Sequence, residues 1–226
     1  MRFDSTQRHE WTTRIERARE IQEELRDRVV KWDRFSKITR VAGVDIGIDR
    51  KTNQARAAAV VLGFPGCELL DHVVVKRRIR FPYVPGYLSF REVPPIMAAL
   101  EKLSVSPDLI ICDGQGIAHP RRFGLACHLG VLADLPTIGA AKSRLIGTHE
   151  EPGRHKGQWC ELKDKDEIIG TVLRTRSDVR PLFVSIGHRV NLPTAVRIVL
   201  QCCTRYRLPE TTRAAHRLAS GIGTPD

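Results

Sequence analysis

The chain has 226 residues and carries 37 Lys and Arg against 26 Asp and Glu, a formal net charge of +11. Its 42% hydrophobic and 28% charged residues are ordinary globular composition, which excludes a disordered basic tail. No apolar run reaches the roughly 18–20 residues of a membrane span, and the first residues lack the apolar core of a signal peptide. We therefore expect a cytoplasmic protein whose charge attracts a polyanion, above all nucleic acid, the alternative being that the charge serves general solubility.

Six cysteines are spread along the chain without C-x-x-C spacing. They are Cys67, Cys112, Cys127, Cys160, Cys202 and Cys203. In a chain without a secretory signal, this pattern predicts reduced thiols and argues against a zinc site or a disulfide framework.

The first third of the chain predicts one helix and three strands. Apolar residues recur at three- and four-residue steps from about Gln7 to Lys31, which indicates an amphipathic packing helix. Strand patterns follow at Arg40–Asp49, Ala55–Phe64 and Glu68–Arg80. Their connections are too short for a parallel return, so we expect antiparallel pairing.

After a Pro- and Gly-rich loop, helices and strands alternate. The predicted elements are a helix at Glu92–Leu103 with Pro94 and Pro95 near its start, a strand at Asp108–Asp113, a helix at Gly124–Ala133, a strand at Pro136–Lys142, two strands near Glu167–Thr175 and Leu182–Ile186, and two helices near Leu192–Cys203 and Glu210–Ala219. Three antiparallel strands followed by helix-connected parallel strands are the layout of a ribonuclease-H-like α/β fold. We expect one domain over residues 1–226, with its catalytic core at about 40–220.

Three acidic residues stand apart from the amphipathic surfaces. Asp45 interrupts an apolar strand, where an uncompensated carboxylate is costly, and Asp113 ends the apolar run of the fourth strand. Glu92 opens the helix between them. If the first and fourth strands are neighbours, Asp45 and Asp113 lie one strand spacing apart and Glu92 overhangs them. Taken singly, each is explained as a turn aspartate or a helix-start glutamate, but together they suit Mg²⁺, with Mn²⁺ as a substitute, and metal-assisted phosphodiester hydrolysis.

Two basic residues are weaker candidates for the same centre. Lys142 closes an apolar strand and could reach a scissile phosphate. His216, on the last helix, is equally explained as an ordinary surface or core histidine.

Two loops have features of nucleic-acid contacts. The stretch Pro82–Tyr87 holds two tyrosines on a proline-stiffened loop, and Gly86 would allow close approach of a base, although an ordinary turn over the core explains the pattern as well. The stretch His119–Arg122 brings two arginines to a predicted helix start, where they could position phosphate.

Together these motifs resemble endonuclease V, the deoxyinosine-directed repair nucleases. The resemblance runs in order from about residue 40 to residue 217. It is carried by Val41–Gly47, Pro82–Glu92, Asp113–Arg122, Pro136–Lys142, Gly187–Arg189 and Tyr206–Arg213.

The resemblance implies Mg²⁺-dependent cleavage of the second phosphodiester 3′ to deoxyinosine, leaving 3′-hydroxyl and 5′-phosphate ends. Asp45, Asp113 and Glu92 would hold the metal, Lys142 would contact the scissile region, and His216 would lie near the metal. Residues implied to bind the substrate are Tyr83 as a wedge that replaces the flipped base, Gly86, Leu88, Gly114 and Leu125 in the base pocket, and, from the loop pattern above, His119 and Arg121.

Two departures from the family pattern bear on substrate preference. Gln115 stands where His or Asn is expected, and Cys112 stands where an aliphatic residue is usual. We expect a monomeric nuclease acting on DNA that contains deoxyinosine. The alternatives are a nuclease acting mainly on inosine in RNA or on structured DNA, and a catalytically silent nucleic-acid-binding protein.

Overall fold

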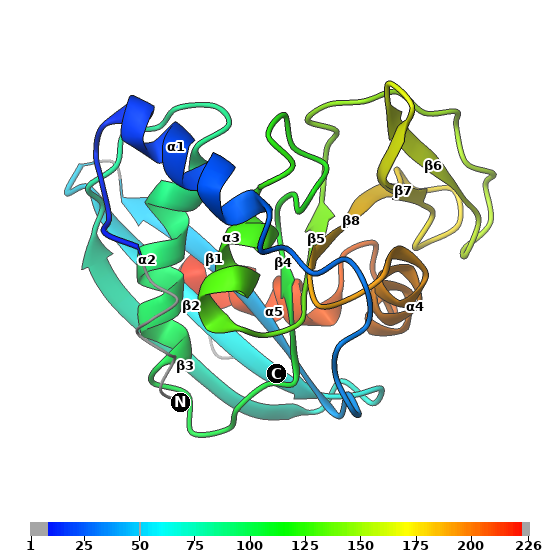
Figure 1. Cartoon of the computed structure of the whole chain (residues 1–226). Coiled ribbons are helices and arrows are strands. Elements are labelled where there is room, and N and C mark those ends of the chain that lie inside the picture. The colour runs from blue at the N-terminus through cyan, green and yellow to red at the C-terminus, as the bar shows by residue number, and fades with distance from the viewer. Residues whose placement is uncertain (1–8, 50, 223–226) are drawn as a thin grey trace.

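A mixed β-sheet of eight strands forms the centre of the molecule, with helices on both faces (Figure 1). The computed structural model describes residues 9–49 and 51–222. In chain order the elements are α1 (Ile15–Arg26), β1 (Arg40–Asp49), β2 (Gln54–Gly63), β3 (Leu69–Arg78), α2 (Leu88–Leu100), β4 (Leu109–Cys112), α3 (Leu125–Ala133), β5 (Thr137–Ala141), β6 (Trp159–Asp164), β7 (Glu167–Leu173), β8 (Leu182–His188), α4 (Leu192–Cys202) and α5 (Glu210–Ala219).

Strand pairing confirms the predicted α/β layout. The sheet order is β3-β2-β1-β4-β5-β8-β7-β6, with β1, β2 and β3 antiparallel and with β4 and β5 parallel to β1. In the β1–β4 register, Val44 lies opposite Cys112. The residues that follow these two, Asp45 and Asp113, therefore lie next to each other, Asp45 within β1 and Asp113 just after the end of β4.

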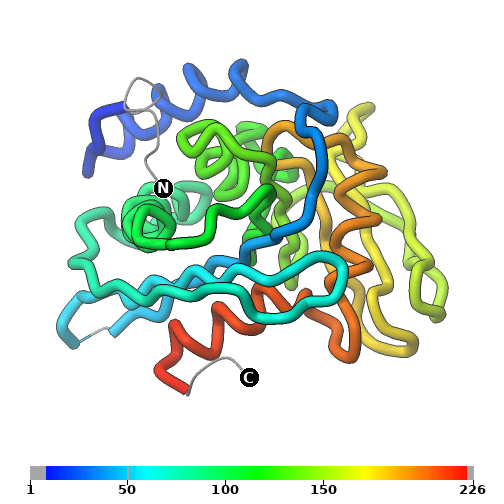
Figure 2. Tube along the Cα trace, turned by 90° about the horizontal axis from the view of Figure 1, so that it is seen from below, coloured from blue at the N-terminus to red at the C-terminus, as the bar shows by residue number. Residues whose placement is uncertain are grey.

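The two faces of the sheet bury different helices. Figure 2 shows α5 on one side of the strands and α1, α2 and α3 on the other. Side chains alternate between the two faces of a strand. In β2, Ala57, Ala59 and Val61 accordingly belong to the main core with α2 and α3, whereas Ala58 and Val60 pack against α5.

The first helix is shorter than predicted. Residues 7 and 8 lie outside the described residues, and α1 spans only Ile15–Arg26 of the predicted stretch that ends at Lys31. Before it, Trp11 packs edge-on against Phe90 instead of joining the helical stripe. After it, the backbone of Val30 bonds to the end of β8 and to the next residue, because its N–H donates to His188 Nδ1 and its carbonyl accepts from the Arg189 N–H. These contacts replace further helical hydrogen bonds.

The second helix begins four residues earlier than predicted, so Glu92 lies in its second turn and does not open it. Pro94 and Pro95 are inside the helix. Because proline has no N–H, the carbonyls of Phe90 and Arg91 lose their helical donors. The helix tolerates this loss because the buried side chains around the prolines pack across α3 and the sheet.

One strand, β6, was missing from the sequence prediction. It is an outer strand with mostly partly exposed or exposed residues, so it lacks the apolar run that marked the central strands. The other boundaries differ by at most a few residues, and β1 and α5 match their predicted ranges. Within the described residues, no helix is long and apolar enough to cross a membrane.

Candidate active site

Glycines on β1 bring α5 close to the sheet. Every second position of β1 lies on the same face of the strand, and one face therefore holds Gly43, Asp45 and Gly47. A Cβ atom at Gly43 would lie 2.1 Å from the backbone of Thr211, and one at Gly47 would lie 2.2 Å from the Ala219 carbonyl oxygen. Only glycine therefore permits this packing, and it places His216 over Asp45.

Three carboxylates meet at the edge of β1 and β4. Asp45 and Asp113 are each less than one-fifth exposed. Burial raises the pKa of Asp45, and the charge of Asp113 adds to the increase, whereas the hydrogen bond from His216 Nδ1 to Asp45 Oδ2 (2.7 Å) opposes it. Burial together with the charges of Asp45 and Asp113 raises the pKa of Glu92 to about 8. The three acids are therefore near enough to influence one another electrostatically, and their role as metal ligands stays a prediction.

Two cationic side chains lie at this centre. Lys142 Nζ forms an ion pair with Asp113 Oδ2. The carbonyl of Lys142 accepts a hydrogen bond from Arg207 Nη2 (2.7 Å), which also donates to the carbonyl of Pro181. Arg207 thus fixes the backbone at Lys142, a role that the sequence analysis missed because the two residues are far apart in the chain.

The donor set fits a divalent cation in its chemistry. Asp45, Asp113 and Glu92 offer hard oxygen ligands, and their mutual repulsion favours a cation between them. Among the described residues, no three His, Cys, Asp or Glu side chains form a ready ligand shell. Instead, His216 and Lys142 each compensate one carboxylate.

A cavity of about 380 Å³ opens beside the carboxylates. It reaches Asp113 and Lys142 at one end and the loop of residues 82–87 at the other. Its lining includes every predicted substrate-binding residue except Arg121, namely Tyr83, Gly86, Leu88, Gly114, His119 and Leu125. The side chain of Tyr83 is 70% exposed at the rim.

The loop at residues 82–87 is held through one carbonyl group. Gly86 adopts a φ of +80°, and its carbonyl accepts hydrogen bonds from Gln22 Nε2 (3.2 Å), His119 Nε2 (3.0 Å) and Arg121 Nη2 (2.6 Å). Arg121 also donates to Gln22 Oε1 and stacks on the ring of Tyr87, 4.3 Å from its centroid. Gln22 was not predicted to take part, since it sits in an α1 stripe that marks only helix packing.

These contacts change the expected roles of His119, Arg121 and Arg122. Burial, followed by the charge of Arg121, lowers the pKa of His119 to about 4, so the ring is neutral and donates through Nε2. Arg121 fastens the loop and does not face the cavity. Arg122 pairs with Asp164 and Glu167, each at 2.7 Å. Neither arginine presents an unpaired guanidinium to phosphate, contrary to the prediction.

The two departures noted in the sequence lie close to this cavity. Gln115 is buried and lines it, donating from Nε2 to the Ser143 carbonyl (2.9 Å), while its Oε1 has no hydrogen-bond partner among the described residues. Cys112 is fully buried in β4, and burial raises the pKa of its thiol, so the thiol stays protonated.

Comparison with known proteins decides the family. The family model described as Endonuclease V matches residues 23–217. The chain belongs to the Endonuclease V family. It is 58% identical over 210 residues to Endonuclease V of Roseiflexus sp. (strain RS-1), covering 93% of this chain and 94% of that protein. It is 56% identical over 209 residues to Endonuclease V of Rippkaea orientalis, covering 92% and 91%.

Solved Endonuclease V structures have the same fold. The enzyme from Streptomyces avermitilis is 45% identical with a TM-score of 0.89, and the match covers 92% of each chain. Endonuclease V from Ciona intestinalis, solved with a 23mer DNA containing an inosine followed by a ribo-adenosine, is 32% identical with a TM-score of 0.82, covering 92% of this chain and 95% of that one.

Proposed function

We propose that this Endonuclease V family member is a Mg²⁺-dependent nuclease that recognises deoxyinosine and hydrolyses the second phosphodiester 3′ to it, leaving 3′-hydroxyl and 5′-phosphate ends. The observation that carries the proposal is the electrostatic grouping of Asp45, Asp113 and Glu92, in which Asp113 pairs with Lys142 and both of these residues line a cavity. The family supports the reaction class. The inosine-containing DNA bound by the Ciona relative supports the base.

Asp45, Asp113 and Glu92 would hold the cation, and Mn²⁺ would substitute for Mg²⁺. When bound, the cation lowers the pKa of an attacking water and neutralises charge on the phosphate. Burial and the charges of Asp45 and Asp113 raise the pKa of Glu92, and a cation held by these residues would favour their ionised forms.

Lys142 would act on the phosphate, and His216 would act on one of the carboxylates. Lys142, held beside Asp113, is placed to stabilise negative charge that develops on the scissile phosphate. His216 donates from Nδ1 to Asp45 and thereby fixes the orientation of that carboxylate. His216 is therefore a positioning residue in this scheme.

The cavity would receive the extruded base. Its volume of about 380 Å³ is within the range of small-ligand sites, and glycines at positions 86 and 114 leave backbone exposed along its wall. Hypoxanthine differs from adenine by a carbonyl at its pairing edge, which backbone N–H groups can recognise. The exposed Tyr83 at the rim would fill the gap that the base leaves in its strand.

A cleavage assay tests the proposal. Matched DNA and RNA oligonucleotides, each with and without a single inosine, are incubated with Mg²⁺ or with EDTA, and the ends are mapped. We expect Mg²⁺-dependent cleavage of inosine-containing strands only, at the second phosphodiester 3′ to the inosine. Equal cleavage of all four substrates would disprove base recognition, and no cleavage would favour a silent binding protein. Cleavage confined to RNA would favour the RNA-directed alternative.

A further inference from the structure

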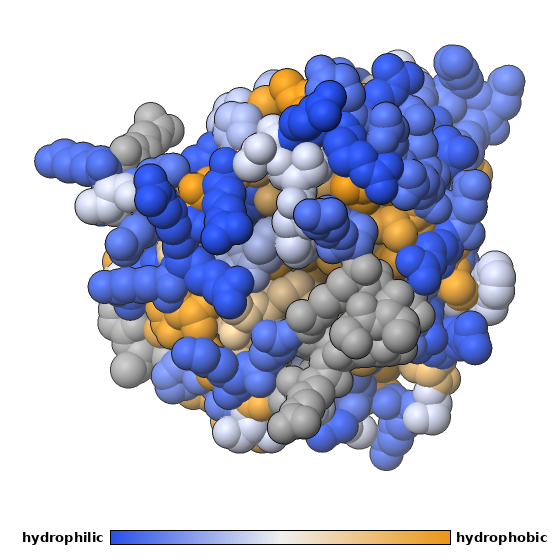
Figure 3. Space-filling model, turned by 60° about the vertical axis from the view of Figure 1, so that its left-hand side comes forward, coloured by the Kyte–Doolittle hydropathy of each residue, from blue (hydrophilic) through white to orange (hydrophobic). Residues whose placement is uncertain are grey.

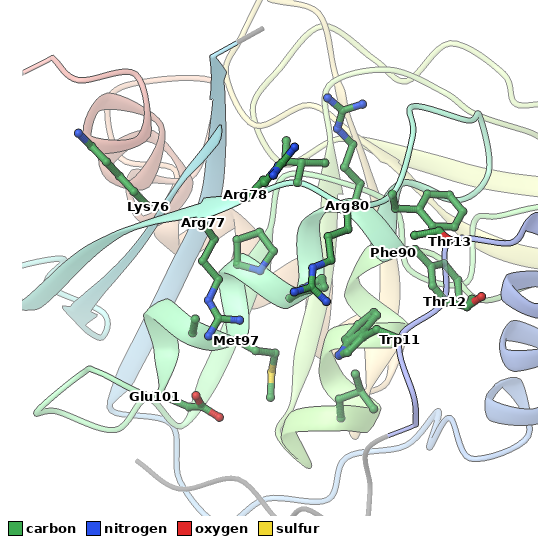
Figure 4. Close-up of a pocket in the computed structure, with 17 residues that line it drawn as sticks. Trp11, Thr12, Thr13, Lys76, Arg77, Arg78, Arg80, Phe90, Met97 and Glu101 are labelled. Carbon is green, nitrogen blue, oxygen red and sulfur yellow. The ribbon is translucent and has the colours of Figure 1, made fainter. Parts of the chain in front are cut away.

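A second and larger concavity lies between β3 and α2, outside the cavity described above. It measures about 710 Å³ and is called here the β3–α2 groove. Its walls come from the N-terminal segment, the end of β3, α2 and one residue of α3 (Figure 4). Its lining side chains include five cations and one carboxylate, namely Lys76, Arg77, Arg78, Arg80, Arg91 and Glu101.

The cations of the β3–α2 groove lack ion-pair partners among the described residues. Some arginines elsewhere do pair with acids, as Arg122 does with Asp164 and Arg40 with Asp108. Within residues 9–49 and 51–222, by contrast, none of the five groove cations forms an ion pair with a carboxylate. In addition, Arg91 Nε is buried without a hydrogen-bond partner. Concentrated, uncompensated positive charge in a concave site suits a polyanion.

Between the cations, the groove offers apolar and aromatic surface. Trp11 is 38% exposed and rests edge-on against Phe90, with ring centroids 6.0 Å apart. Figure 4 shows Arg77 extending over α2 towards Met97 and Glu101. On this side of the molecule, long hydrophilic side chains surround apolar patches (Figure 3). A cationic groove with an exposed aromatic ring is the usual binding surface for single-stranded nucleic acid, because phosphates meet the cations and bases stack on the ring.

The groove adjoins the base cavity near Tyr83. Tyr83 lines the base cavity, Arg91 lines the groove, and the guanidinium carbon of Arg91 lies 5.9 Å from the Tyr83 ring centroid. Phe81 also connects the two, since it lines the groove and precedes the loop. In the proposed reaction the catalytic centre lies 3′ of the inosine, so a strand that passes Tyr83 away from that centre runs in the 5′ direction.

We propose that the β3–α2 groove binds the nucleotides 5′ of the inosine as a single strand, with Arg77 and Arg80 contacting phosphates and Trp11 offering a stacking surface. The assignment of direction rests on the proposed function. Binding of a single strand by the groove does not.

The test varies the 5′ flank of the substrate. Single-stranded inosine oligonucleotides with the same 3′ side carry about two or about twelve nucleotides on the 5′ side, which bracket a typical single-strand site. The double variant Arg77→Gln/Arg80→Gln is compared with wild type and with Arg176→Gln/Arg197→Gln, two exposed arginines outside the groove. We expect the groove variant to raise KM roughly ten-fold on the long flank, and we expect no such difference on the short one.

Equilibrium binding keeps the two proposals separate. Binding to inosine-free single strands of about twelve nucleotides is measured by fluorescence anisotropy, and the groove variant should bind more weakly than the control variant. Its slope of log binding constant against log salt concentration should be smaller in magnitude by about 1.4, or about 0.7 for each lost phosphate contact. Binding equal to that of the control variant would overturn the groove proposal, whatever the outcome of the cleavage assay. A KM loss of equal size on both flanks would overturn the 5′ assignment. Failure to cleave inosine strands, with the binding difference intact, would overturn only the proposed function.

Discussion

At the scale of single residues, Asp45 connects the local sequence to the proposed chemistry. It is the middle residue of a Gly-x-Asp-x-Gly pattern, in which the glycines admit α5 and the aspartate meets His216. The same pattern puts the carboxylate beside Asp113 and Glu92. An acid buried among acids is costly to keep unless the site uses it, and that cost supports a functional role.

Asp45→Ala should lower the cleavage rate at least about 100-fold, because loss of a group that merely orients a metal ligand already costs about 10–100-fold. Binding of inosine DNA should change little, since the cavity and Tyr83 are untouched. Single-turnover cleavage and anisotropy measure the two effects. Asp166→Ala, at an exposed acid remote from the site, serves as the control. A variant at Asp45 that cleaves at a comparable rate would remove it from the metal site.

Gly86→Ala should weaken recognition of inosine. Its φ of +80° disfavours any side chain, and a Cβ atom would lie 3.0 Å from Arg121 Nη2, within the hydrogen bonds that fix the loop. Gly157→Ala is the matched control, because φ is +93° there but the nearest atom to the new Cβ is 3.9 Å away. We expect both variants to lose about 1 kcal/mol of stability from backbone strain, with only Gly86→Ala raising KM for the inosine strand. Equal KM values for the two variants on the inosine strand would show that the hydrogen-bonded loop at residues 82–87 does not govern recognition.

At the scale of elements, α1 acts as a support for the recognition loop. Its buried Gln22 donates to the carbonyls of Gly86 and Phe123 and accepts from Arg121. Through these contacts a helix that lies outside the sheet fixes one wall of the base cavity.

Gln22→Leu should preserve α1 and loosen the loop. The variant removes the Gln22 partner of Arg121 Nε and of the Phe123 carbonyl, which costs roughly 1–3 kcal/mol of stability if they stay buried, whereas the Gly86 carbonyl keeps its donors on His119 and Arg121. Discrimination between inosine and adenosine strands should fall, as measured by the ratio of kcat/KM values. Glu23→Gln, on the exposed face of the same helix, is the control. Unchanged discrimination would mean that Arg121 and His119 hold the loop without α1.

Local sequence patterns predicted the helices and strands better than they predicted the contacts between them. The apolar run of β1 and the amphipathic α5 match their predicted bounds because both are decided by local periodicity. The ends of α1 are decided by partners far along the chain, such as His188, which no local pattern contains. In the same way, the carboxylates could be placed from strand order, whereas the engagement of Arg121 and Arg122 by protein groups could not.

At the scale of the whole molecule, the net charge of +11 is unevenly compensated. Ion pairs use arginines on α1, at the start of β1 and beside β7, while the β3–α2 groove keeps its cations unpaired within the described residues. Of the three acids, Asp113 lines the other cavity, which Tyr83 also lines. In the proposed scheme, positive charge would hold the nucleic acid and the local negative charge would take part in the reaction.

Buried histidines make the stability of the whole fold depend on pH. Burial, followed by the neighbouring charge of Arg189, lowers the pKa of His188 to about 4, whereas the unfolded value is about 6.5. Above pH 6.5 both states hold the ring neutral. Between about pH 6.5 and 4 only the unfolded chain takes up the proton, so stability falls as the pH falls.

The variant His188→Asn should remove this contribution while keeping an acceptor for the Val30 N–H. Compared with wild type, the slope of unfolding free energy against pH should decrease by about 1.4 kcal/mol per pH unit between about pH 6 and 4.5. Urea unfolding at a series of pH values, without divalent cations, measures the difference, and the site carboxylates cancel because they are common to both proteins. Equal slopes for the two proteins would mean that His188 takes up its proton as readily in the folded state as in the unfolded chain. In that case its ring would have to turn away from Val30.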